Sequence, residues 1–554
     1  MERGDVRGTK SEEEERETGE RGDGNERKYE EGRVHKAMRP FAYTSPVVFV
    51  TTSAQSSARD AAAIAAGTPS YALMQRAGAA AAAAIKRHAA QRLVGGVAVF
   101  AGAGNNGGDA WIVAGALRRD GVTVRVHATA DPATDDARAA RTDALAAGPF
   151  DAPRGDETIV VDGLLGTGSS GAPRGAVAAA LDQIRAARTR GAFVLALDVP
   201  SGLDATTGEV PAGVVPADVT VTFGTLKRGL VIAREVAGAI EVADIGLGAA
   251  AAAIADGAPP VLDAETVRAA IPPIAASAHK GTRGRIAIVG GSTGMAGATV
   301  YAARGALRSG AGLVRLVVAP ESLESVQRTV PEATASIWPA SAADVAAAIG
   351  NPDALVLGPG LGANGRDVLT RVLAGSRAKA VLDADALNAF AGDVNALRGA
   401  LDGRDAMLTP HAAECARVLG VATADVLRER FEIGLRLARA AHAVVVLKGT
   451  PTVISAPDGR VVVAPVGSPV LATGGSGDVL AGIAGVLVAT MPNAFAAAQA
   501  AVWAHGAAAE HVATTNVRGA TLDDVMHALR DVWHAPVAVL PPGVLAVLPA
   551  VGER

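Results

Sequence analysis

The sequence predicts an α/β protein with two parallel-sheet domains, each with helices on both faces of its sheet. Short runs rich in Val, Ile and Leu alternate with Ala-rich stretches of helical length, and glycine-rich turns follow several of the runs. Apolar residues make up 49% of the 554 residues, whereas aromatic residues make up only 3%. A core built mainly from Ala, Val, Leu and Ile is typical of parallel sheets, whose strands are buried on both faces.

Composition shifts divide the chain into two domains. The first domain is expected at residues 50–248, and its predicted strands are residues 97–104, 123–129, 158–165, 193–200 and 218–224. An Ala-rich linker is expected at residues 249–260. The second domain is expected at residues 261–535, and its predicted strands are residues 285–291, 312–320, 354–360, 380–386, 444–450 and 452–456.

The two ends of the chain differ from these domains in composition. Residues 1–46 are dense in charged side chains, so we expect a disordered extension. The same stretch lacks the apolar core of a secretory signal. Residues 536–554 are expected to form a Pro-rich apolar tail, because their prolines would interrupt a membrane-spanning helix.

Net charge and cysteine content indicate which partners and compartment to expect. The formal net charge of −4 disfavours nucleic acid or an anionic membrane as the main partner, because both bind basic surfaces. A small-molecule substrate is the better expectation. Cys415 is the only cysteine, so no internal disulfide can form, and a reducing compartment such as the cytoplasm is expected.

A glycine-rich turn follows the first predicted strand. Residues 105–109 read NNGGD, and a helical stretch comes directly after them. Glycines let a ligand approach the backbone, and the N-terminus of the following helix favours an anion such as phosphate. Asn-Gly-Gly also serves plain turns, so this loop alone leaves both interpretations open.

Two further aspartates stand at the ends of predicted strands, each beside glycines. Asp162 precedes the stretch GTGSSGA, and Asp198 precedes Pro-Ser-Gly. In a doubly wound sheet the carboxyl ends of the strands lie at one edge, where ligands bind. Asp109, Asp162 and Asp198 are therefore expected to converge. Any one of them could be a helix or turn cap, but three acids at one edge favour a ligand site.

These motifs carry a resemblance to a known family. GNNGGD, DGLLGTG, DVPSGLD and VTFGTLKRGL resemble the NAD(P)H-hydrate epimerases over about residues 53–248. The resemblance implies a Rossmann-like three-layer domain that binds the hydrated cofactors NADHX and NADPHX and interconverts their R and S epimers. The substrate-binding residues that it implies are Asn105, Asn106, Gly107, Gly108, Asp109, Gly166, Thr167, Gly168, Ser169, Ser170, Gly171, Ala172 and Asp198.

The same resemblance implies a potassium ion, K+, held by Asn106, Asp162 and Ser201. Amide carbonyl, carboxylate and hydroxyl oxygens suit a hard monovalent cation. Asp162 has a second candidate role, as the catalytic acid or base during proton transfer at the hydrated ring. The sequence does not separate these two roles.

The second domain contains a glycine loop that ends in an aspartate, LATGGSGDVLAG at residues 471–482. The common phosphate-binding loop has a lysine where an anion must be neutralised, but this loop has Asp478. The backbone N–H groups of residues 474–477 and the N-terminus of the next helix are expected to hold a phosphate without a lysine. Asp478 is then predicted to be catalytic, because phosphoryl transfer needs a group that orients the acceptor hydroxyl and takes its proton late.

Other polar residues of this domain lie at strand ends and turns. Asp383 and Asp385 end a predicted strand, although Asp385 also suits a helix cap. His411 and Glu414 stand where a loop enters a helix, and a lone histidine is equally consistent with a structural hydrogen bond. Lys448 lies in a predicted hairpin turn, where a lysine meets phosphate as a point charge.

Five ordered motifs carry a second resemblance. KGTRG, GPGLG, DADALN, TPHAAE and GGSGDVLAG resemble the ADP-dependent NAD(P)HX dehydratases of the ribokinase-like superfamily over about residues 261–530. The resemblance implies a ribokinase-like three-layer domain that phosphorylates the hydroxyl of the hydrate and then releases phosphate to restore the reduced ring. The implied hydrate contacts are Gly297, Gly362, His411 and Asp478, and the implied ADP contacts are Lys448, Gly449, Thr450, Pro451, Thr452 and Gly477. Glu414 is implied to help hold Mg2+ through water.

The leading hypothesis is a bifunctional repair enzyme that epimerises NAD(P)HX and dehydrates the S form with ADP. Joining the two activities in one chain is useful, because a dehydratase that accepts only one epimer would leave the other epimer unrepaired. One alternative is a ribokinase-like kinase of a vitamin or sugar alcohol fused to a nucleotide-binding domain. Another is a first domain that only binds a nucleotide or a protein. Relatives of the dehydratase also imply a homo-oligomer.

Overall fold

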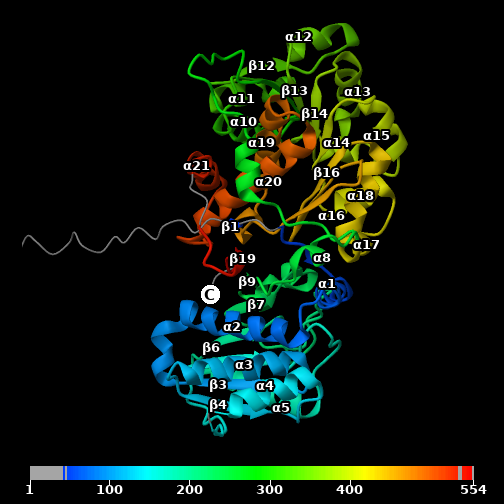
Figure 1. Cartoon of the computed structure of the whole chain (residues 1–554). Coiled ribbons are helices and arrows are strands. Elements are labelled where there is room, and N and C mark those ends of the chain that lie inside the picture. The colour runs from blue at the N-terminus through cyan, green and yellow to red at the C-terminus, as the bar shows by residue number, and fades with distance from the viewer. Residues whose placement is uncertain (1–41, 44–46, 147, 535–538, 552–554) are drawn as a thin grey trace, which may run out of the picture. The chain divides into compact units, whose positions relative to one another are not determined.

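The structure is a computed structural model that describes residues 42–43, 47–146, 148–534 and 539–551 (Figure 1). The predicted charged extension at residues 1–46 lies outside the described residues except for strand β1 (Ala42–Tyr43). The described residues form two large sheets and one two-stranded sheet. The α/β class expected from the sequence is confirmed.

The first large sheet has the strand order β1-β19-β9-β7-β6-β5-β3-β4. All neighbouring pairs from β9 to β4 are parallel. The five predicted strands are present, and β9 is an additional strand that was not predicted. These strands are β3 (Val97–Ala101), β4 (Val124–Ala128), β5 (Ile159–Gly163), β6 (Phe193–Leu197), β7 (Val219–Phe223) and β9 (Ala239–Ala243). The two-stranded sheet pairs β2 (Val50–Thr51) with β8 (Leu226–Lys227).

Helices cover both faces of this sheet. In Figure 1, α2 and α3 run along one side of the strands. The helices of this domain are α1 (Ser53–Ala65), α2 (Ser70–Ala89), α3 (Asn105–Arg119), α4 (Asp135–Leu145), α5 (Gly175–Thr189), α6 (Arg228–Ile232), α7 (Arg234–Ala237) and α8 (Gly248–Ala252), with the 3-10 helix η1 (Ala90–Gly95).

Alternate residues of one strand enter two separate apolar layers. Val97 and Val99 of β3 pack in the layer that contains residues of α2 and α3, whereas Phe100 packs in the layer that contains Leu181 and Ile184 of α5. This alternation follows from the two-residue period of a strand, because both faces of the sheet are covered. The result is three layers, and every residue of β3 is buried.

The chain end adds a strand that was not predicted. The expectation for residues 536–554 is an apolar tail, but β19 (Val544–Leu548) pairs antiparallel with β9, and β1 pairs with β19 in turn. Val547 lies opposite Glu241 in this register. The physical reason is that β9 offers an open sheet edge, and a short apolar run satisfies its unpaired backbone groups. The pairing joins segments about 300 residues apart, so local sequence patterns do not reveal it.

The predicted linker at residues 249–260 is partly ordered. Helix α8 occupies its first residues, and Val50 N donates a hydrogen bond to Pro259 O at 2.8 Å. An isolated antiparallel bridge also joins Phe49 to Pro260. Backbone pairing therefore attaches this segment to the start of the first domain.

The second large sheet has the order β12-β11-β10-β13-β14-β15-β16-β17-β18. Its first seven strands are parallel, and β16, β17 and β18 pair antiparallel. The six predicted strands and the predicted hairpin are present, whereas β12, β15 and β18 were not predicted. The strands are β10 (Arg285–Val289), β11 (Leu313–Val318), β12 (Thr334–Ile337), β13 (Ala354–Leu357), β14 (Lys379–Leu382), β15 (Ala406–Leu408), β16 (Val444–Leu447), β17 (Thr452–Ser455) and β18 (Val461–Ala464).

The helices of this domain also divide between two faces. One apolar core contains the strands together with α13, α15, α16 and α18, while α19 packs closely against both α10 and α20. The helices are α9 (Ala264–Ala270), α10 (Ala296–Arg308), α11 (Leu323–Thr329), α12 (Val345–Ile349), α13 (Arg366–Gly375), α14 (Asp385–Asn388), α15 (Val394–Leu401), α16 (Ala412–Leu419), α17 (Thr423–Arg428), α18 (Arg430–Ala441), α19 (Ser476–Thr490), α20 (Ala494–Ala513) and α21 (Leu522–Val532). Four short 3-10 helices accompany them: η2 (Pro320–Ser322), η3 (Ala342–Asp344), η4 (Ala363–Gly365) and η5 (Pro469–Leu471).

Small residues let α19 approach both its neighbouring helix and the sheet. A Cβ at Gly482 would lie 1.9 Å from Ala302 O of α10, and a Cβ at Gly485 would lie 2.4 Å from Val356 Cγ2 of β13. Close packing at these two glycines fixes the position of the helix whose first turn carries Asp478.

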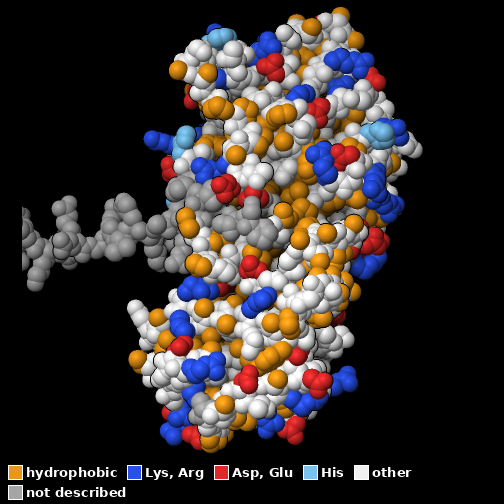
Figure 2. Space-filling view, in the orientation of Figure 1, with side chains coloured by type: hydrophobic (Ala, Val, Ile, Leu, Met, Phe, Trp, Pro, Cys, Tyr) orange, Lys and Arg blue, Asp and Glu red, His pale blue; other side chains and the backbone are white. Residues whose placement is uncertain are grey.

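The described surface carries charges of both signs. On the face that Figure 2 shows, Lys and Arg side chains are interspersed with Asp and Glu side chains. Across the described ranges, no helix is long and apolar enough to cross a membrane.

Candidate active sites

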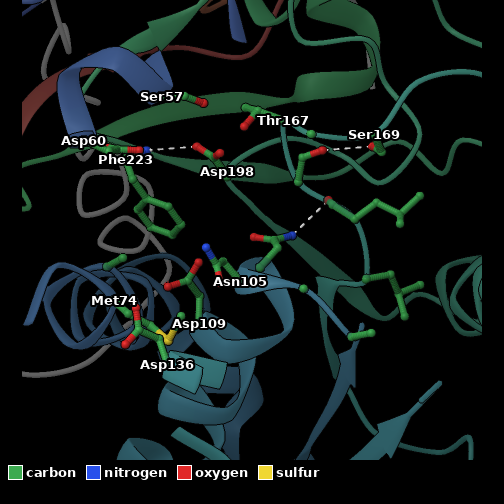
Figure 3. A pocket seen from close by; sticks show the side chains of 18 of the residues that line it. Ser57, Asp60, Met74, Asn105, Asp109, Asp136, Thr167, Ser169, Asp198 and Phe223 are labelled. Atoms are coloured by element: carbon green, nitrogen blue, oxygen red, sulfur yellow. Dashed lines mark hydrogen bonds between the residues drawn. The ribbon is translucent and has the colours of Figure 1, made fainter. Parts of the chain in front are cut away.

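The first domain contains a cavity of about 720 Å3. It lies where β3, β5, β6 and β7 end, so it occupies the edge at which ligands bind in a doubly wound sheet. Helices α1 and α2 complete its wall with residues such as Ser57, Asp60 and Met74 (Figure 3).

The predicted NNGGD loop forms the first turn of α3. Asn105, Asn106 and Asp109 line the cavity, but Gly107 and Gly108 do not. A Cβ at Gly107 would lie 1.8 Å from Gly102 O, and a Cβ at Gly108 would lie 2.6 Å from Met74 Sδ. These two glycines therefore permit close packing behind the cavity, while their polar neighbours face it.

The second predicted loop reaches the cavity with only its first half. Gly166, Thr167, Gly168 and Ser169 line the cavity, whereas residues 170–172 (Ser170, Gly171 and Ala172) are outside its lining. Asp198 also lines it. Figure 3 shows Thr167, Ser169 and Asp198 on the side of the cavity opposite Met74.

Asn106, Asp162 and Ser201 come together, as the sequence predicts, but Asp162 and Ser201 lie behind the cavity wall. Ser201 Oγ donates to Asp162 Oδ1 at 2.5 Å, and Ser201 N donates to Oδ2 at 2.9 Å. Asn106 Nδ2 donates to Leu165 O at 2.9 Å, and Leu165 N donates to Ser201 Oγ at 2.9 Å. Asn106 Oδ1 is buried without a hydrogen-bond partner in the described part of the chain.

Asp162 is nearly inaccessible, with 1% of its surface exposed. Burial raises the pKa of its carboxyl group, while hydrogen bonds from the Ser201 hydroxyl, Ser201 N and Leu164 N act in the opposite direction. The carboxylate thus accepts three hydrogen bonds from a fixed shell. This arrangement suits a carboxylate that either fixes the surrounding loops in place or binds a cation.

Asp198 forms a buried ion pair that was not predicted from the sequence. Lys227, on β8, places Nζ 2.5 Å from Asp198 Oδ1 and donates to Phe223 O at 2.9 Å. The same Asp198 oxygen accepts from Thr222 Oγ1 at 3.1 Å and from Phe223 N at 3.3 Å. Asp198 has a φ of +62°, in the left-handed region. A non-glycine residue persists there only where its surroundings determine it, and this is common at functional sites.

Three other acids line this cavity without a side-chain hydrogen bond among the described residues: Asp60, Asp109 and Asp136, which lies in the first turn of α4. Among the described residues, neither Asp60 on α1 nor Asp109 on α3 has a side-chain partner. Burial is the largest cause that raises the pKa of each carboxyl group. The nearby Asp198 charge raises both pKa values further, while Lys227 lowers them.

The second domain has its own cavity, of about 670 Å3. It is bordered by the β16–β17 hairpin turn, the loop before η5 and the start of α19. The predicted residues His411, Lys448, Gly449, Thr450, Pro451, Thr452, Gly477 and Asp478 all line it.

The start of α19 has the geometry expected for an anion cradle. Gly475 caps the helix with a φ of +94°, a conformation that glycine adopts at little cost. A Cβ at Gly477 would lie 3.1 Å from Lys448 Nζ and 3.3 Å from Asp383 Oδ2. The N-terminal end of α19 therefore brings together the loop backbone, the Lys448 ammonium group and the carboxyl groups of Asp383 and Asp478.

Asp478 lies in the first turn of α19 and faces this cavity. Burial, followed by the charge of Asp383, raises the pKa of Asp478 to about 7, and Lys448 acts in the opposite direction. A carboxyl group with a pKa near neutrality can both take up and release a proton under ordinary conditions.

Lys448 lies beside two acids that were singled out from the sequence, Asp383 and Glu414. Its Nζ lies 2.7 Å from Asp383 Oδ1 and 3.9 Å from Glu414 Oε2. Burial lowers the pKa of Lys448, but the Asp383 and Glu414 carboxylates outweigh it and raise the value overall. The lysine is therefore held as a cation in the cavity wall.

His411 and Glu414 form a capping box at the start of α16. His411 Nδ1 accepts from Ala413 N and Glu414 N, and Glu414 Oε2 accepts from His411 N at 2.8 Å. His411 lines the cavity, whereas Glu414 does not. Both the functional role and the structural hydrogen bond considered from the sequence are thus compatible with the position of His411.

Gly297 and Gly362 lie outside the lining of this cavity. Gly297 is exposed in the first turn of α10, and no atom lies within 4 Å of the position that a Cβ would take there. Gly362 N donates to Asp385 Oδ2 at 2.8 Å. The structure therefore does not bring these two glycines together with Asp478 in one cavity, because they stand at the ends of β10 and β13 rather than at the hairpin.

Two family models match the chain. The model described as YjeF-related protein N-terminus matches residues 70–229, and the model described as NAD(P)H-hydrate dehydratase matches residues 286–530. Each matched region contains one of the two cavities' glycine loops.

Curated relatives match across both regions. A bifunctional NAD(P)H-hydrate repair enzyme from Moorella thermoacetica is 37% identical over 424 residues, which cover 71% of this chain and 79% of the relative. The chain belongs to the bifunctional NAD(P)H-hydrate repair enzyme family. A family member from Escherichia coli is 35% identical over 372 residues, which cover 65% of this chain and 70% of the relative.

A solved structure resembles part of this repair-enzyme family member. It is an ADP/ATP-dependent NAD(P)H-hydrate dehydratase from Bacillus subtilis, co-crystallised with ATP/Mg2+. The two chains are 30% identical, the match covers 50% of this chain and 97% of the other, and the TM-score is 0.44.

Three residues that line the cavities of this repair-enzyme family member were missed from the sequence. Asp60 stands in an Ala-rich helix that carries no glycine motif, and Lys227 is the lysine of the motif VTFGTLKRGL, which was given no role of its own. His505 lines the second cavity from inside α20, where burial lowers its pKa to about 4. Its Nε2 has no partner in the described part of the chain. A polar residue within an apolar helical stretch was the available signal in each helix.

Proposed function

We propose that this chain repairs hydrated nicotinamide dinucleotides in two steps. The first domain interconverts R- and S-NAD(P)HX, and the second domain dehydrates S-NAD(P)HX to NAD(P)H with ADP. The observation that carries this proposal is that each region matched by a family model has a cavity lined by its own acids and glycine loop. Two separate acid-lined cavities suit two reactions on one substrate better than they suit one reaction.

In the first cavity, the dinucleotide is proposed to lie against residues 105–109 and 166–172, with Asp198 also in contact. The N-terminus of α3 favours an anion, so the pyrophosphate is expected near Asn105 and Gly104. Gly107 and Gly108 contribute by letting α3 pack close to the sheet.

The buried group behind this cavity fits the proposed K+. Asn106 offers a carbonyl oxygen without a partner, and Asp162 and Ser201 add carboxylate and hydroxyl oxygens in the same cluster. Oxygen donors of these kinds suit a hard monovalent cation. A bound cation would supply positive charge beside an anionic substrate, and the three residues would hold it. Asp162 is proposed as a cation ligand, and its acid or base role remains the alternative.

In the second cavity, ADP is proposed to lie against residues 448–452 and Gly477, with the hydrate near His411 and Asp478. The N–H groups at the start of α19 and the Lys448 cation balance the negative charge of phosphate. Asp478 orients the hydroxyl of the hydrate and accepts its proton as the bond to phosphorus forms. Phosphate is a better leaving group than hydroxide, so its departure restores the ring double bond.

Gly297 and Gly362 are proposed as hydrate contacts on the resemblance alone. Both stand at the carboxyl edge of the second sheet, beyond the described lining of the cavity. A dinucleotide is long enough to extend along this edge, so one of its halves would have to reach them.

The carboxylate of Glu414 fits a water-mediated contact with Mg2+ rather than a direct one. It already accepts a hydrogen bond from His411 N and lies 3.9 Å from Lys448 Nζ. Mg2+ commonly keeps several waters and binds through substrate phosphates. The described part of the chain has no group of three His, Cys, Asp or Glu side chains arranged for a metal. When bound, Mg2+ would neutralise phosphate charge.

The homo-oligomeric state and cytoplasmic location stay predictions. A ribokinase-like kinase fused to a non-catalytic nucleotide-binding domain is the competing function. Incubation of the purified chain with mixed NADHX epimers, with and without ADP and Mg2+, separates the two. Recovery of near-ultraviolet NADH absorbance is expected only with ADP, and a stable phosphorylated alcohol would support the kinase.

A further inference from the structure

Five aspartates lie in or directly behind the wall of the first cavity, and they divide into two kinds. Asp162 and Asp198 each accept several hydrogen bonds from fixed donors. Asp60, Asp109 and Asp136 line the cavity, and none of the three has a side-chain hydrogen bond or ion pair among the described residues; Asp60 and Asp109 are the two that also act on each other electrostatically. The oxygens of this second kind are available to a ligand.

Asp60 and Asp109 approach the cavity from different elements. Asp60 extends from α1, and Asp109 extends from the first turns of α3. In Figure 3 they occupy separate positions around the cavity, with Phe223 between them in this view. Because they come from different elements, the two carboxyl groups can meet a bound ring from different directions.

The two groups differ in their electrostatic surroundings. Burial is the largest effect on the pKa of Asp60 and raises it overall, while the Lys227 cation lowers it and the Asp198 charge raises it. For Asp109, burial and the charges of Asp198 and Asp60 all raise the pKa and outrank the effect of Lys227. Lys227 therefore ranks higher among the effects on the pKa of Asp60 than among those on the pKa of Asp109, so the two carboxyl groups are not equivalent.

The chemistry of epimerisation requires such a pair. Hydration of an enamine-type ring double bond places the hydroxyl on the carbon next to the ring nitrogen. Inversion at that carbon follows when the C–O bond breaks and water adds to the opposite face. The leaving oxygen needs a proton on one face, and the entering water must lose one on the other.

We propose that Asp60 and Asp109 are the two proton-transfer residues of epimerisation, one on each face of the hydrated ring. This inference rests on the proposed function of the first domain. It leaves Asp162 as a cation ligand and Asp198 as an anchor for Lys227.

The step conserves atoms and charge. One carboxylic acid protonates the hydroxyl, the C–O electron pair leaves with the new water, and the nitrogen lone pair forms a C=N bond. Water then adds to the opposite face, returns the electron pair to nitrogen and gives its extra proton to the other carboxylate. The pair ends with its protonation states exchanged, ready for the reverse reaction, and solvent restores the first state.

The first test uses Asp60→Asn and Asp109→Asn in the full chain. Without ADP, each variant is expected to lose epimerisation of pure R- or S-NADHX by at least about 100-fold, the usual size of a proton-transfer contribution. Asp135→Asn, at the exposed start of α4 and outside the cavity lining, is the matched control and is expected to keep wild-type rates. Dehydration of S-NADHX with ADP should persist in all three variants and reports correct folding.

The second test distinguishes proton transfer from a structural role. In H2(18)O, wild type is expected to incorporate 18O into both epimers. Asp60→Asn should exchange the oxygen of one epimer without inverting it, because the remaining acid still serves one face. Asp109→Asn should exchange the opposite epimer. A structural defect would lower exchange of both epimers together.

The results of these two tests separate the proposed function of the domain from the roles assigned to Asp60 and Asp109. Wild type that does not epimerise would overturn the proposed function of this domain. Wild type that epimerises, with both variants equally active or with equal exchange of the two epimers in each variant, would overturn the assignment of Asp60 and Asp109 alone.

Discussion

Lys448 Nζ lies 2.7 Å from Asp383 Oδ1 in the wall of the second cavity. Asp383 is buried at the end of β14, with 1% of its surface exposed, so its carboxylate has little access to water. The lysine supplies the charge that this carboxylate needs and, at the same time, a cation facing the cavity. Stability and the proposed nucleotide binding therefore depend on the same residue.

Loss of the Lys448 cation is expected to lower both the stability of the fold and the affinity for ADP. Lys448→Met would leave Asp383 buried without its charged partner, and we expect the free energy of unfolding to fall by about 2–3 kcal/mol. ADP affinity should fall as well. Chemical denaturation and calorimetric titration measure the two effects. The double variant Lys448→Met/Asp383→Leu should recover stability but not ADP affinity, and recovery of both would contradict the assigned role.

Asp478 is expected to act in turnover rather than in nucleotide binding. Asp478→Asn should lower kcat for S-NADHX dehydration by about 100-fold or more, because the amide cannot accept the hydroxyl proton. The ADP dissociation constant should stay within a few-fold of wild type. The exposed Asp531→Asn on α21 is a suitable control. Unchanged kcat in Asp478→Asn would remove this residue from the mechanism.

The pH dependence of dehydration is expected to follow the same carboxyl group. Burial and Asp383 raise the pKa of Asp478 to about 7, and the proton acceptor must be ionised. The value of kcat/KM should therefore increase as the pH rises through about 7. In Asp478→Asn this increase should be absent. A flat wild-type profile from pH 5 to pH 9 would be inconsistent with Asp478 as the acceptor.

The same raised pKa predicts how stability changes with pH. Between the ordinary Asp value of 3.8 and about 7, the folded chain holds a proton at Asp478 that the unfolded chain has lost. Stability from this group is therefore present at low pH and decreases as pH rises through that window. Asp478→Asn should raise Tm more at pH 8 than at pH 5. An equal shift at both values would indicate that the pKa of this group is not raised.

Asp162 is expected to be essential for use of the R epimer. Asp162→Ala should abolish epimerisation while sparing ADP-dependent dehydration of S-NADHX, because the affected cluster belongs to the first domain. Replacing K+ by a bulky organic cation should slow wild-type epimerisation but leave dehydration unchanged. Equal rates on both epimers in Asp162→Ala would contradict the assignment.

Two glycine substitutions test the packing of α19. Gly482→Ala would place a Cβ 1.9 Å from Ala302 O, and we expect a loss of about 1–3 kcal/mol of stability. Gly399→Ala on α15 has no atom within 4 Å of the added Cβ and should gain up to about 1 kcal/mol. Thermal unfolding of the two variants measures the contrast. Similar Tm shifts would show that α19 does not pack as described.

Local patterns in the sequence were enough for the class of fold and most of its strands. Val97 to Ala101 and Arg285 to Val289 are apolar runs followed by glycines, and both became central parallel strands. β19 could not be found in this way, because its pairing with β9 depends on two segments distant in sequence. β12, β15 and β18 are short, with three or four residues each, and give weak periodic signals.

The candidate sites were predicted unevenly for a similar reason. Asp478 and Lys448 stand beside glycines at turns, which marks them in the sequence, and both line one cavity. Asp60 and Lys227 carry no such mark, since only folding brings α1 and β8 to the cavity. Gly297 was predicted as a hydrate contact, yet it lies outside the described lining because a motif does not reveal how far a cavity extends.

Repair of pure R-NADHX tests the central claim most directly. R-NADHX incubated with the purified full chain, ADP and Mg2+ should give complete recovery of NADH absorbance, because epimerisation supplies the S form for dehydration. Without ADP, the R form should convert only to a mixture of epimers, with no NADH. Persistence of R-NADHX when ADP is present, while S-NADHX is dehydrated, would contradict the two-step account.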